Sequence, residues 1–322
     1  MTAFKTIKGV PVKTISGDRA GASFEGQLYY DSDGVGIFKF VGALGAGSWA
    51  SGGALNVAKS SAGTAGTQTA GLYFGGYAPG GITAQTEKYD GSSWTEVNDL
   101  NTARGNLAGA GTQTSALAFG GGPPVKNETE KFDGTSWTEV NNLNTARQVL
   151  AGTGTQTAAL AFGGEITANS ASAESWNGTS WTEIAALNSA RYAHGGAGTT
   201  TSALAFGGSN PTTAITESWN GSAWSEVADL NTARYALAGF GSSNTSALAV
   251  GGFKTGDVHA NETEIWNGTS WTEVNNLATG RQQIRGSGST LTAFVAGGVD
   301  PSKTTATEEW TVAHAIKTVA LS

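Results

Sequence analysis

The chain has 322 residues, of which 48 are Gly, 13% are charged and none is Cys. This Gly content is about twice the usual share and is typical of a turn-rich β-protein, while the formal net charge of −7 argues against nucleic acid or an anionic membrane as a partner. Without Cys, disulfides, thiolate metal ligands and cysteine nucleophiles are excluded, and no apolar run is long enough to predict a secretory signal or a membrane-spanning helix.

Residues 1–45 precede the repetitive part of the chain and are expected to form an N-terminal arm. Within them, the turn sequence Asp31-Ser-Asp-Gly34 separates two apolar runs, which predicts a β-hairpin. Two interpretations of the arm stay open, because it could anchor the chain to another protein or pack as a strand pair on the chain's own ring. The arm is basic, with Lys5, Lys8, Lys13 and Arg19.

Residues 46–311 contain one pattern of about 44 residues in six copies. Each copy has a basic residue, a run of small residues, an apolar run ending at Gly-Gly, a Glu-x-aromatic triplet, an Asp-Gly or Asn-Gly turn in most copies, and a Trp. A repeat of this length, made of short apolar runs separated by turns, predicts a closed ring of four-stranded β-blades. The Gly-Gly pairs begin at Gly75, Gly120, Gly163, Gly207, Gly251 and Gly297.

Each copy predicts one blade. The small residues at 148–155 suit an innermost strand near the ring axis, and Ala-Leu-Ala-Phe at 159–162 suits a buried second strand. The Glu-x-aromatic triplet predicts the third strand, and the turn after it leads into an outer strand. Aromatic residues on these two strands are expected to stack between neighbouring blades. The outer strands begin at Trp49, Trp94, Trp137, Trp181, Trp224 and Trp271.

The last copy lacks an outer strand of its own. Trp49 is followed ten residues later by Lys59, the same spacing that separates Trp94 from Arg104. The Trp49 strand is therefore expected to complete the last blade and close the ring, which removes two exposed sheet edges. The predicted fold is all-β: a six-bladed β-propeller closed by an N-terminal outer strand, with a short N-terminal β-hairpin arm. The tail, 312–322, could be a competing strand, an extra strand or a packing arm.

Two charged positions recur in every copy, and both are expected on the same face of the ring. They can meet as a structural set of ion pairs, which we favour because buried charges are normally paired; the alternative is a charged channel mouth that binds an anion. The basic residues are Lys59, Arg104, Arg147, Arg191, Arg234 and Arg281. The acidic residues are Glu87, Glu130, Glu174, Glu217, Glu264 and Glu308.

The loop after each Gly-Gly differs from copy to copy. These six loops should emerge on one face, and loops on a rigid scaffold are where binding specificity usually lies. A host glycan or a neighbouring protein is expected to bind there, unless the loops merely tolerate variation. The side chains best suited to stacking or charge are Tyr77, Lys126, Phe253, Lys254, His259 and Lys303.

The order Gly-Gly, aromatic, Trp and basic residue resembles the kelch repeat over roughly residues 47–311. The runs Trp-Asn-Gly-Thr-Ser-Trp-Thr-Glu-Val at 266–274 and Leu-Asn-Thr-Ala-Arg at 143–147 are similar to kelch-like structural proteins of bacteriophages. Residues 25–40 resemble a hairpin module of phage tail fibres and other virion proteins. The resemblance implies a kelch-like virion structural protein, such as a fibre, spike or decoration protein, which is made in the host cytoplasm.

In such a protein the arm would bind other virion proteins, and the propeller would be displayed to a host-surface glycan or receptor, with several copies in the particle. The chain is predicted not to be an enzyme and to need no cofactor or metal, because near-identical blades do not supply the single unique site that catalysis needs. The alternatives are a bacterial glycan-binding or adhesion propeller and, with less support, a sialidase-like enzyme. The Asp-Gly-Thr-Ser-Trp turns resemble the sialidase Asp-box, which is itself structural.

Metal sites find little support in the sequence. The three His residues, His194, His259 and His314, share no spacing, and His194 occupies a position where other copies have Leu. A calcium loop starting at Asp31 would need Glu at its twelfth position, where the chain has Gly42.

Overall fold

The computed structural model describes residues 46–209 and 211–313 throughout. It also gives the strand backbones at 6–7, 10–11, 13–15, 28–31, 38–44 and 314–319. The chain divides into two compact units, one formed by Met1–Gly47 with Thr311–Ser322 and the other by Ser48–Trp310. In the residues described, the regular structure is entirely β-strand.

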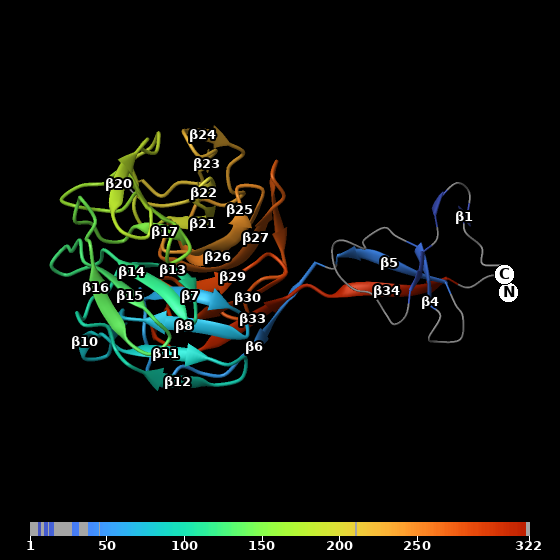
Figure 1. The fold of residues 1–322 in the computed structure, drawn as a ribbon, viewed down its shortest axis with the longest axis horizontal. Helices are drawn as coiled ribbons and strands as arrows, with labels where there is room; N and C mark the ends of the chain where they lie inside the picture. Colours follow the sequence, from blue (N-terminus) through green and yellow to red (C-terminus); the bar gives the residue numbers. More distant parts are fainter. Residues whose placement is uncertain are drawn as a thin grey trace. The chain divides into compact units, whose positions relative to one another are not determined.

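The unit Ser48–Trp310 is a ring of six antiparallel four-stranded sheets, which confirms the predicted six-bladed propeller (Figure 1). We number the blades along the chain and give the strands of each blade from the axis outward. Blade 1 consists of β7 (Gly63–Thr67), β8 (Ala70–Phe74), β11 (Thr86–Tyr89) and β12 (Trp94–Val97). Blade 2 consists of β13 (Ala108–Thr112), β14 (Ser115–Phe119), β15 (Thr129–Phe132) and β16 (Trp137–Val140). Blade 3 consists of β17 (Ala151–Gly154), β18 (Ala159–Phe162), β19 (Ala173–Trp176) and β20 (Trp181–Ile184).

The remaining three blades follow the same order. Blade 4 consists of β21 (Gly195–Thr199), β22 (Ser202–Phe206), β23 (Thr216–Trp219) and β24 (Trp224–Val227). Blade 5 consists of β25 (Ala238–Ser243), β26 (Ser246–Lys254), β27 (Val258–Trp266) and β28 (Trp271–Val274). Blade 6 consists of β29 (Arg285–Gly288), β30 (Thr292–Ala296), β33 (Thr307–Thr311) and β6 (Ser48–Ser51). The strand that contains Trp49 therefore closes the ring, as predicted.

Local sequence explains the strand order within a blade. In blade 3, Phe162 pairs with Ala151 on the inner strand, and Trp176 pairs with Trp181 across the outer hairpin. The turn of that hairpin is held by Asn177, whose Oδ1 accepts hydrogen bonds of 2.9 Å from two backbone N–H groups. The second strand stops at a Gly-Gly pair whose φ angles are 62° and 99°, in the region that favours glycine.

The hydrophobic core lies between the blades. The Phe that ends the second strand packs against the outer Trp of the next blade, with ring centroids 4.9 Å apart for Phe74–Trp137 and 5.1 Å for Phe162–Trp224. The outer Trp also donates a hydrogen bond from Nε1 to a Thr of the preceding blade, such as 3.1 Å from Trp137 to Thr86. Burying a large side chain contributes about 1.5–3 kcal/mol, so each blade is stabilised mainly through its neighbours.

At the seam between blades 6 and 1 the packing uses different residues. Ala296 takes the place of the usual Phe, and Phe294 and Tyr73 approach Trp94 instead, with centroids 5.6 and 6.1 Å away. Within blade 6, Trp49 lies 5.3 Å from Trp310 between ring centroids. The ring is therefore closed by side-chain packing as well as by strand pairing.

The other unit contains a separate four-stranded sheet in the order β3 (Lys13–Ile15), β4 (Leu28–Asp31), β5 (Phe38–Leu44) and β34 (His314–Val319). Strands β4 and β5 pair antiparallel, as expected for the N-terminal hairpin, whereas β3 and β4 are parallel. Strand β34 pairs antiparallel with β5. The tail, whose path the sequence left open, thus supplies an extra strand to the N-terminal sheet. A two-stranded sheet of β1 (Thr6–Ile7) and β2 (Val10–Pro11) lies in the same unit.

Candidate functional site: the loop face and the central channel

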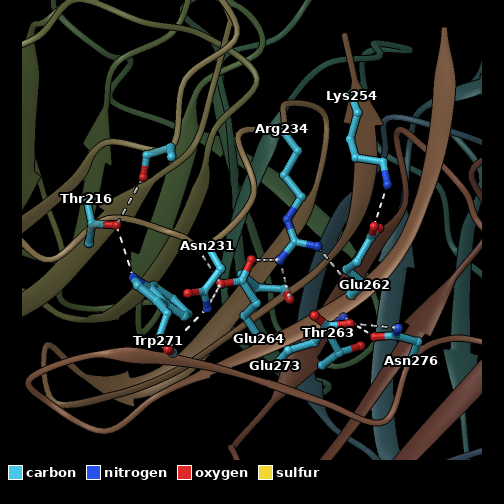
Figure 2. A network of polar contacts seen from close by, with 12 residues as sticks. Thr216, Asn231, Arg234, Lys254, Glu262, Thr263, Glu264, Trp271, Glu273 and Asn276 are labelled. Atoms are coloured by element: carbon cyan, nitrogen blue, oxygen red, sulfur yellow. Dashed lines mark hydrogen bonds and ion pairs between the residues drawn. The ribbon is translucent and has the colours of Figure 1, made fainter. Parts of the chain in front are cut away.

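A network of polar contacts lies where the chain enters each blade, and Figure 2 shows it for blade 5. Arg234 donates from Nη2 to Glu264 Oε1 over 3.0 Å and from Nη1 to the Glu262 carbonyl over 2.7 Å. Asn231 donates from its backbone N–H and from Nδ2 to Glu264 Oε2 over 2.7 and 2.8 Å. The carboxylate is thus bound on both oxygens by protein donors.

The same basic and acidic residues meet in all six blades, and each pair is buried. Burial lowers the pKa of the Arg guanidinium groups, and the partner carboxylate opposes that shift. Removing one partner of a buried pair typically costs about 3–5 kcal/mol, because the other charge is left uncompensated. These charged side chains therefore stabilise the blades. The N–O distances are 2.7 Å for Lys59–Glu87, 3.1 Å for Arg104–Glu130, 2.9 Å for Arg147–Glu174, 3.1 Å for Arg191–Glu217, 3.0 Å for Arg234–Glu264 and 2.7 Å for Arg281–Glu308.

The variable loops lie on the same face as this network. In every blade the residue after the basic residue forms a β-bridge with the residue after Gly-Gly, which fixes the start of each loop beside the entry to the inner strand. The bridges are Ser60–Tyr77, Gly105–Gly122, Gln148–Glu165, Tyr192–Ser209, Tyr235–Phe253 and Gln282–Val299. We call this side of the ring the loop face.

A closed ring of backbone hydrogen bonds surrounds the axis on the loop face. The residue two positions after each basic residue has a left-handed conformation, with φ between 53° and 55°. Its N–H donates to the carbonyl of the equivalent residue in the preceding blade over 2.7 to 3.0 Å. The ring had no sequence signal, because its members share no side-chain type: they are Ser61, Asn106, Val149, Ala193, Ala236 and Gln283.

Two of the predicted binding residues, Tyr77 and Lys303, line one cavity of about 320 Å³ at the mouth of the ring. The cavity is also lined by Asn106 and Gln283, and Asn106 Nδ2 donates to the Tyr77 hydroxyl over 3.2 Å. Partial burial raises the pKa of Tyr77, so its hydroxyl stays protonated at neutral pH. An aromatic ring, an ammonium group and two amides therefore face one small hollow.

Phe253 and His259 form a second cluster. Their ring centroids are 5.1 Å apart, and Tyr235 lies 5.6 Å from Phe253 in an edge-on arrangement. His259 Nδ1 lies 3.4 Å from Asp300 Oδ1 in the next blade. The sequence did not single out Tyr235 or Asp300, because their proximity to Phe253 and His259 depends on how neighbouring segments pack.

The remaining two predicted residues already have partners. Lys126 Nζ lies 3.0 Å from Glu128 Oε1, and Lys254 forms an ion pair with Glu262. In each case the Glu lies two residues before the Glu of the buried network. Both lysines thus extend that network outward, and either would have to leave its carboxylate to bind a ligand.

The inner strands surround a cavity of about 220 Å³ along the axis, lined mostly by Gly and Ala. Two unusual side chains line it, His194 and Arg285. Burial lowers the pKa of His194 well below its usual value, and the neighbouring Arg191, Arg147 and Arg285 lower it further. This imidazole is therefore neutral at pH 7. In the sequence His194 stands out because it replaces Leu, whereas Arg285 does not, because it lies outside the recurring basic positions.

Within the parts of the chain that the structure describes, no three His, Asp or Glu side chains are grouped so as to hold a metal ion. Those residues also contain no helix of the length and apolarity needed to cross a membrane. Comparison of the sequence with family models and with curated proteins gives no match.

Proposed function

We propose that this chain is a non-enzymatic binding protein whose loop face recognises its partner. The observation that carries the proposal is that the recurring and the variable polar groups lie in different surroundings. The recurring charges satisfy one another inside the ring, with N–O distances of 2.7 to 3.1 Å. The chemistry that differs between blades is concentrated in the loops, and the hollow lined by Tyr77 and Lys303 is an example.

We further propose that the chain is a structural component of a phage virion, a fibre, spike or decoration protein. The support for this finer statement is the resemblance of the repeats to kelch-like phage proteins and of residues 25–40 to a virion hairpin module. The unit formed by the two chain ends would contact other virion proteins, and the propeller would be displayed.

Mass spectrometry of purified particles tests the virion assignment. Particles of the phage that encodes this chain would be banded twice on density gradients and digested, and this chain would be quantified against the major capsid protein. A fixed ratio that persists through both gradients is expected. Loss of the chain during banding, while the capsid protein remains, would contradict the assignment.

A bacterial glycan-binding propeller is the second candidate. The mouth hollow favours it, because a sugar ring can stack on Tyr77 while the amides of Asn106 and Gln283 bond its hydroxyls. Binding of the full chain to a glycan array, together with absence from purified virions, would favour this candidate. Binding in both assays would instead identify the glycan as the receptor of the virion protein.

A further inference from the structure

Arg285 is a large, charged residue at a position where the inner strands otherwise have a small one. It stands four residues after Arg281, at the first position of β29. The equivalent residues in the other five blades are Gly or Ala, which lets six strands converge on the axis. They are Gly63, Ala108, Ala151, Gly195 and Ala238.

The guanidinium of Arg285 has little protein to bond. Among the described residues its one acceptor is the carbonyl of Ile284, at 3.0 Å from Nη1. A guanidinium has five N–H donors, and none of those of Arg285 lies within ion-pair distance of a carboxylate in the described chain. Arg281, four residues earlier, differs in having Glu308 at 2.7 Å.

Among the described residues, the surroundings of Arg285 supply no compensating negative charge. Burial lowers the pKa of its guanidinium, and the neighbouring Tyr73 hydroxyl is itself buried with a raised pKa, so it stays neutral. His194, which lines the same cavity, is neutral as well. Arg285 is partly exposed to the channel. Its guanidinium therefore has donors free for an anion that enters from solution, and binding it would offset the cost of a confined charge.

We propose that the central channel binds a small inorganic oxyanion, phosphate or sulfate, on the guanidinium of Arg285. A planar guanidinium presents two parallel N–H groups to a pair of oxyanion oxygens, which makes Arg the side chain best suited to this ligand. The cavity of about 220 Å³ is lined mostly by Gly and Ala, whose small side chains leave room for an anion beside the guanidinium. This site is separate from the hollow at Tyr77 and does not depend on the proposed function.

The channel exists only when all six blades have assembled. An anion held there binds the folded ring and not the unfolded chain, and it must therefore raise stability as its concentration rises. We expect phosphate and sulfate to stabilise the protein more than chloride does at equal ionic strength. The effect should saturate, which distinguishes a site from a general salt effect.

The test uses the full chain and its Arg285→Ala variant, because Ala is the residue that blades 2, 3 and 5 carry at this position. Inorganic phosphate is titrated by calorimetry in a chloride buffer, and thermal unfolding is followed with phosphate, sulfate or chloride. The native chain should bind about one phosphate per molecule. Arg285→Ala should bind roughly tenfold more weakly or not at all, in line with the loss of a bidentate charged contact.

Lys88→Gln is the matched control, since it also removes one positive charge but from the third strand of blade 1, where Lys88 does not line the channel cavity. It should leave phosphate binding unchanged. Should Arg285→Ala misfold, Arg285→Gln and phosphorus NMR line broadening on the native chain provide the same comparison. The proposal is overturned if the native chain binds no phosphate, or if Arg285→Ala binds it as tightly as the native chain.

Discussion

Single residues that depart from the repeat leave recognisable defects in the ring. Five outer Trp residues donate from Nε1 to a Thr of the preceding blade. The sixth, Trp224, faces Ala173, and its buried Nε1 has no acceptor within the described chain. An unsatisfied buried donor costs about 1–3 kcal/mol. Comparison with the other blades shows that the missing acceptor is a Thr hydroxyl at the position of Ala173.

Ala173→Thr should therefore stabilise the protein. The new hydroxyl would accept from Trp224 Nε1, as Thr129 accepts from Trp181 over 3.0 Å. We expect a gain of about 1 kcal/mol in the free energy of unfolding, measured by urea denaturation. Ala173→Val has a similar shape without the acceptor and should give no such gain. An equal gain from both variants would show that packing, and not the hydrogen bond, is responsible.

His194 is a second departure. It lies at a Leu position, it is 6% exposed, and neither ring nitrogen makes a well-formed hydrogen bond in the described chain, although the Phe162 backbone lies close enough to influence it. His194→Leu should raise stability by about 1–3 kcal/mol. Because the folded pKa is lowered, the unfolded chain takes up the proton first, so the native protein loses stability as the pH falls below 6.5.

The pH dependence provides the check on this substitution. Unfolding free energies at pH 8, 7, 6 and 5 should fall less with decreasing pH in the variant, whose curve lacks the His194 contribution. Parallel curves for the native chain and His194→Leu would mean that this imidazole is solvated or hydrogen-bonded in solution.

At the scale of elements, the turn between the third and outer strands occurs in two chemical forms. Asp90 Oδ1 accepts two backbone N–H bonds of 2.8 Å in blade 1, and Asn177 Oδ1 makes the same contacts in blade 3. Hydrogen bonds from the Ser93 and Ser92 backbone and side chains lower the pKa of the Asp90 carboxyl to about 2. The Asp turn is therefore sensitive to acid and the Asn turn is not.

Asp90→Asn should remove part of the acid sensitivity of the protein. A lowered carboxyl pKa contributes stability that is present above the unfolded value near 3.8 and is lost as the pH falls toward 2. The native chain should thus lose more stability than Asp90→Asn between pH 4 and pH 2. Carbon-13 NMR titration of the Asp90 carboxyl checks the cause directly. A pKa near 3.8 would contradict this explanation.

The strands and turns of each blade could be predicted because nearly the same residues recur in all six copies of the repeat. The short hairpins inside the loops could not be predicted. Examples are β9 (Tyr77–Ala78) with β10 (Gly81–Ile82) and β31 (Val299–Asp300) with β32 (Ser302–Lys303). The ring of backbone hydrogen bonds through Val149 and its equivalents could not be predicted either, because it depends on the curvature of the assembled propeller. The partner of β34 has no counterpart in the repeat.

At the scale of the whole molecule, the ring depends on β6. Trp49 donates from Nε1 to Thr263 over 3.0 Å and packs against Trp310, so one side chain joins the last blade to the fifth and to the third strand of its own sheet. This closure was predicted from the spacing between Trp49 and Lys59. The candidate binding residues were predicted less completely, because which loops meet depends on the neighbouring blades.

Trp49→Ala should weaken the closure of the ring. We expect a loss of about 2–3 kcal/mol, somewhat below the cost of deleting a fully buried Trp, because Trp49 is partly exposed. Trp49→Phe keeps an aromatic ring and should lose about 1 kcal/mol. Hydrogen exchange should speed up first in β33 of the Ala variant. Unchanged protection of β33 would show that closure does not rely on this side chain.

We propose the loop face as the binding surface of a virion protein, and adsorption of phage to host cells tests this central proposal most directly. Phage carrying Tyr77→Ala with Lys303→Gln would be compared with phage carrying Thr138→Ala with Glu139→Gln, two exposed positions of the outer strand β16. The loop-face pair should slow adsorption at least tenfold at unchanged particle yield, and the outer-strand pair should have no effect. Normal adsorption by the loop-face variant would contradict the claim.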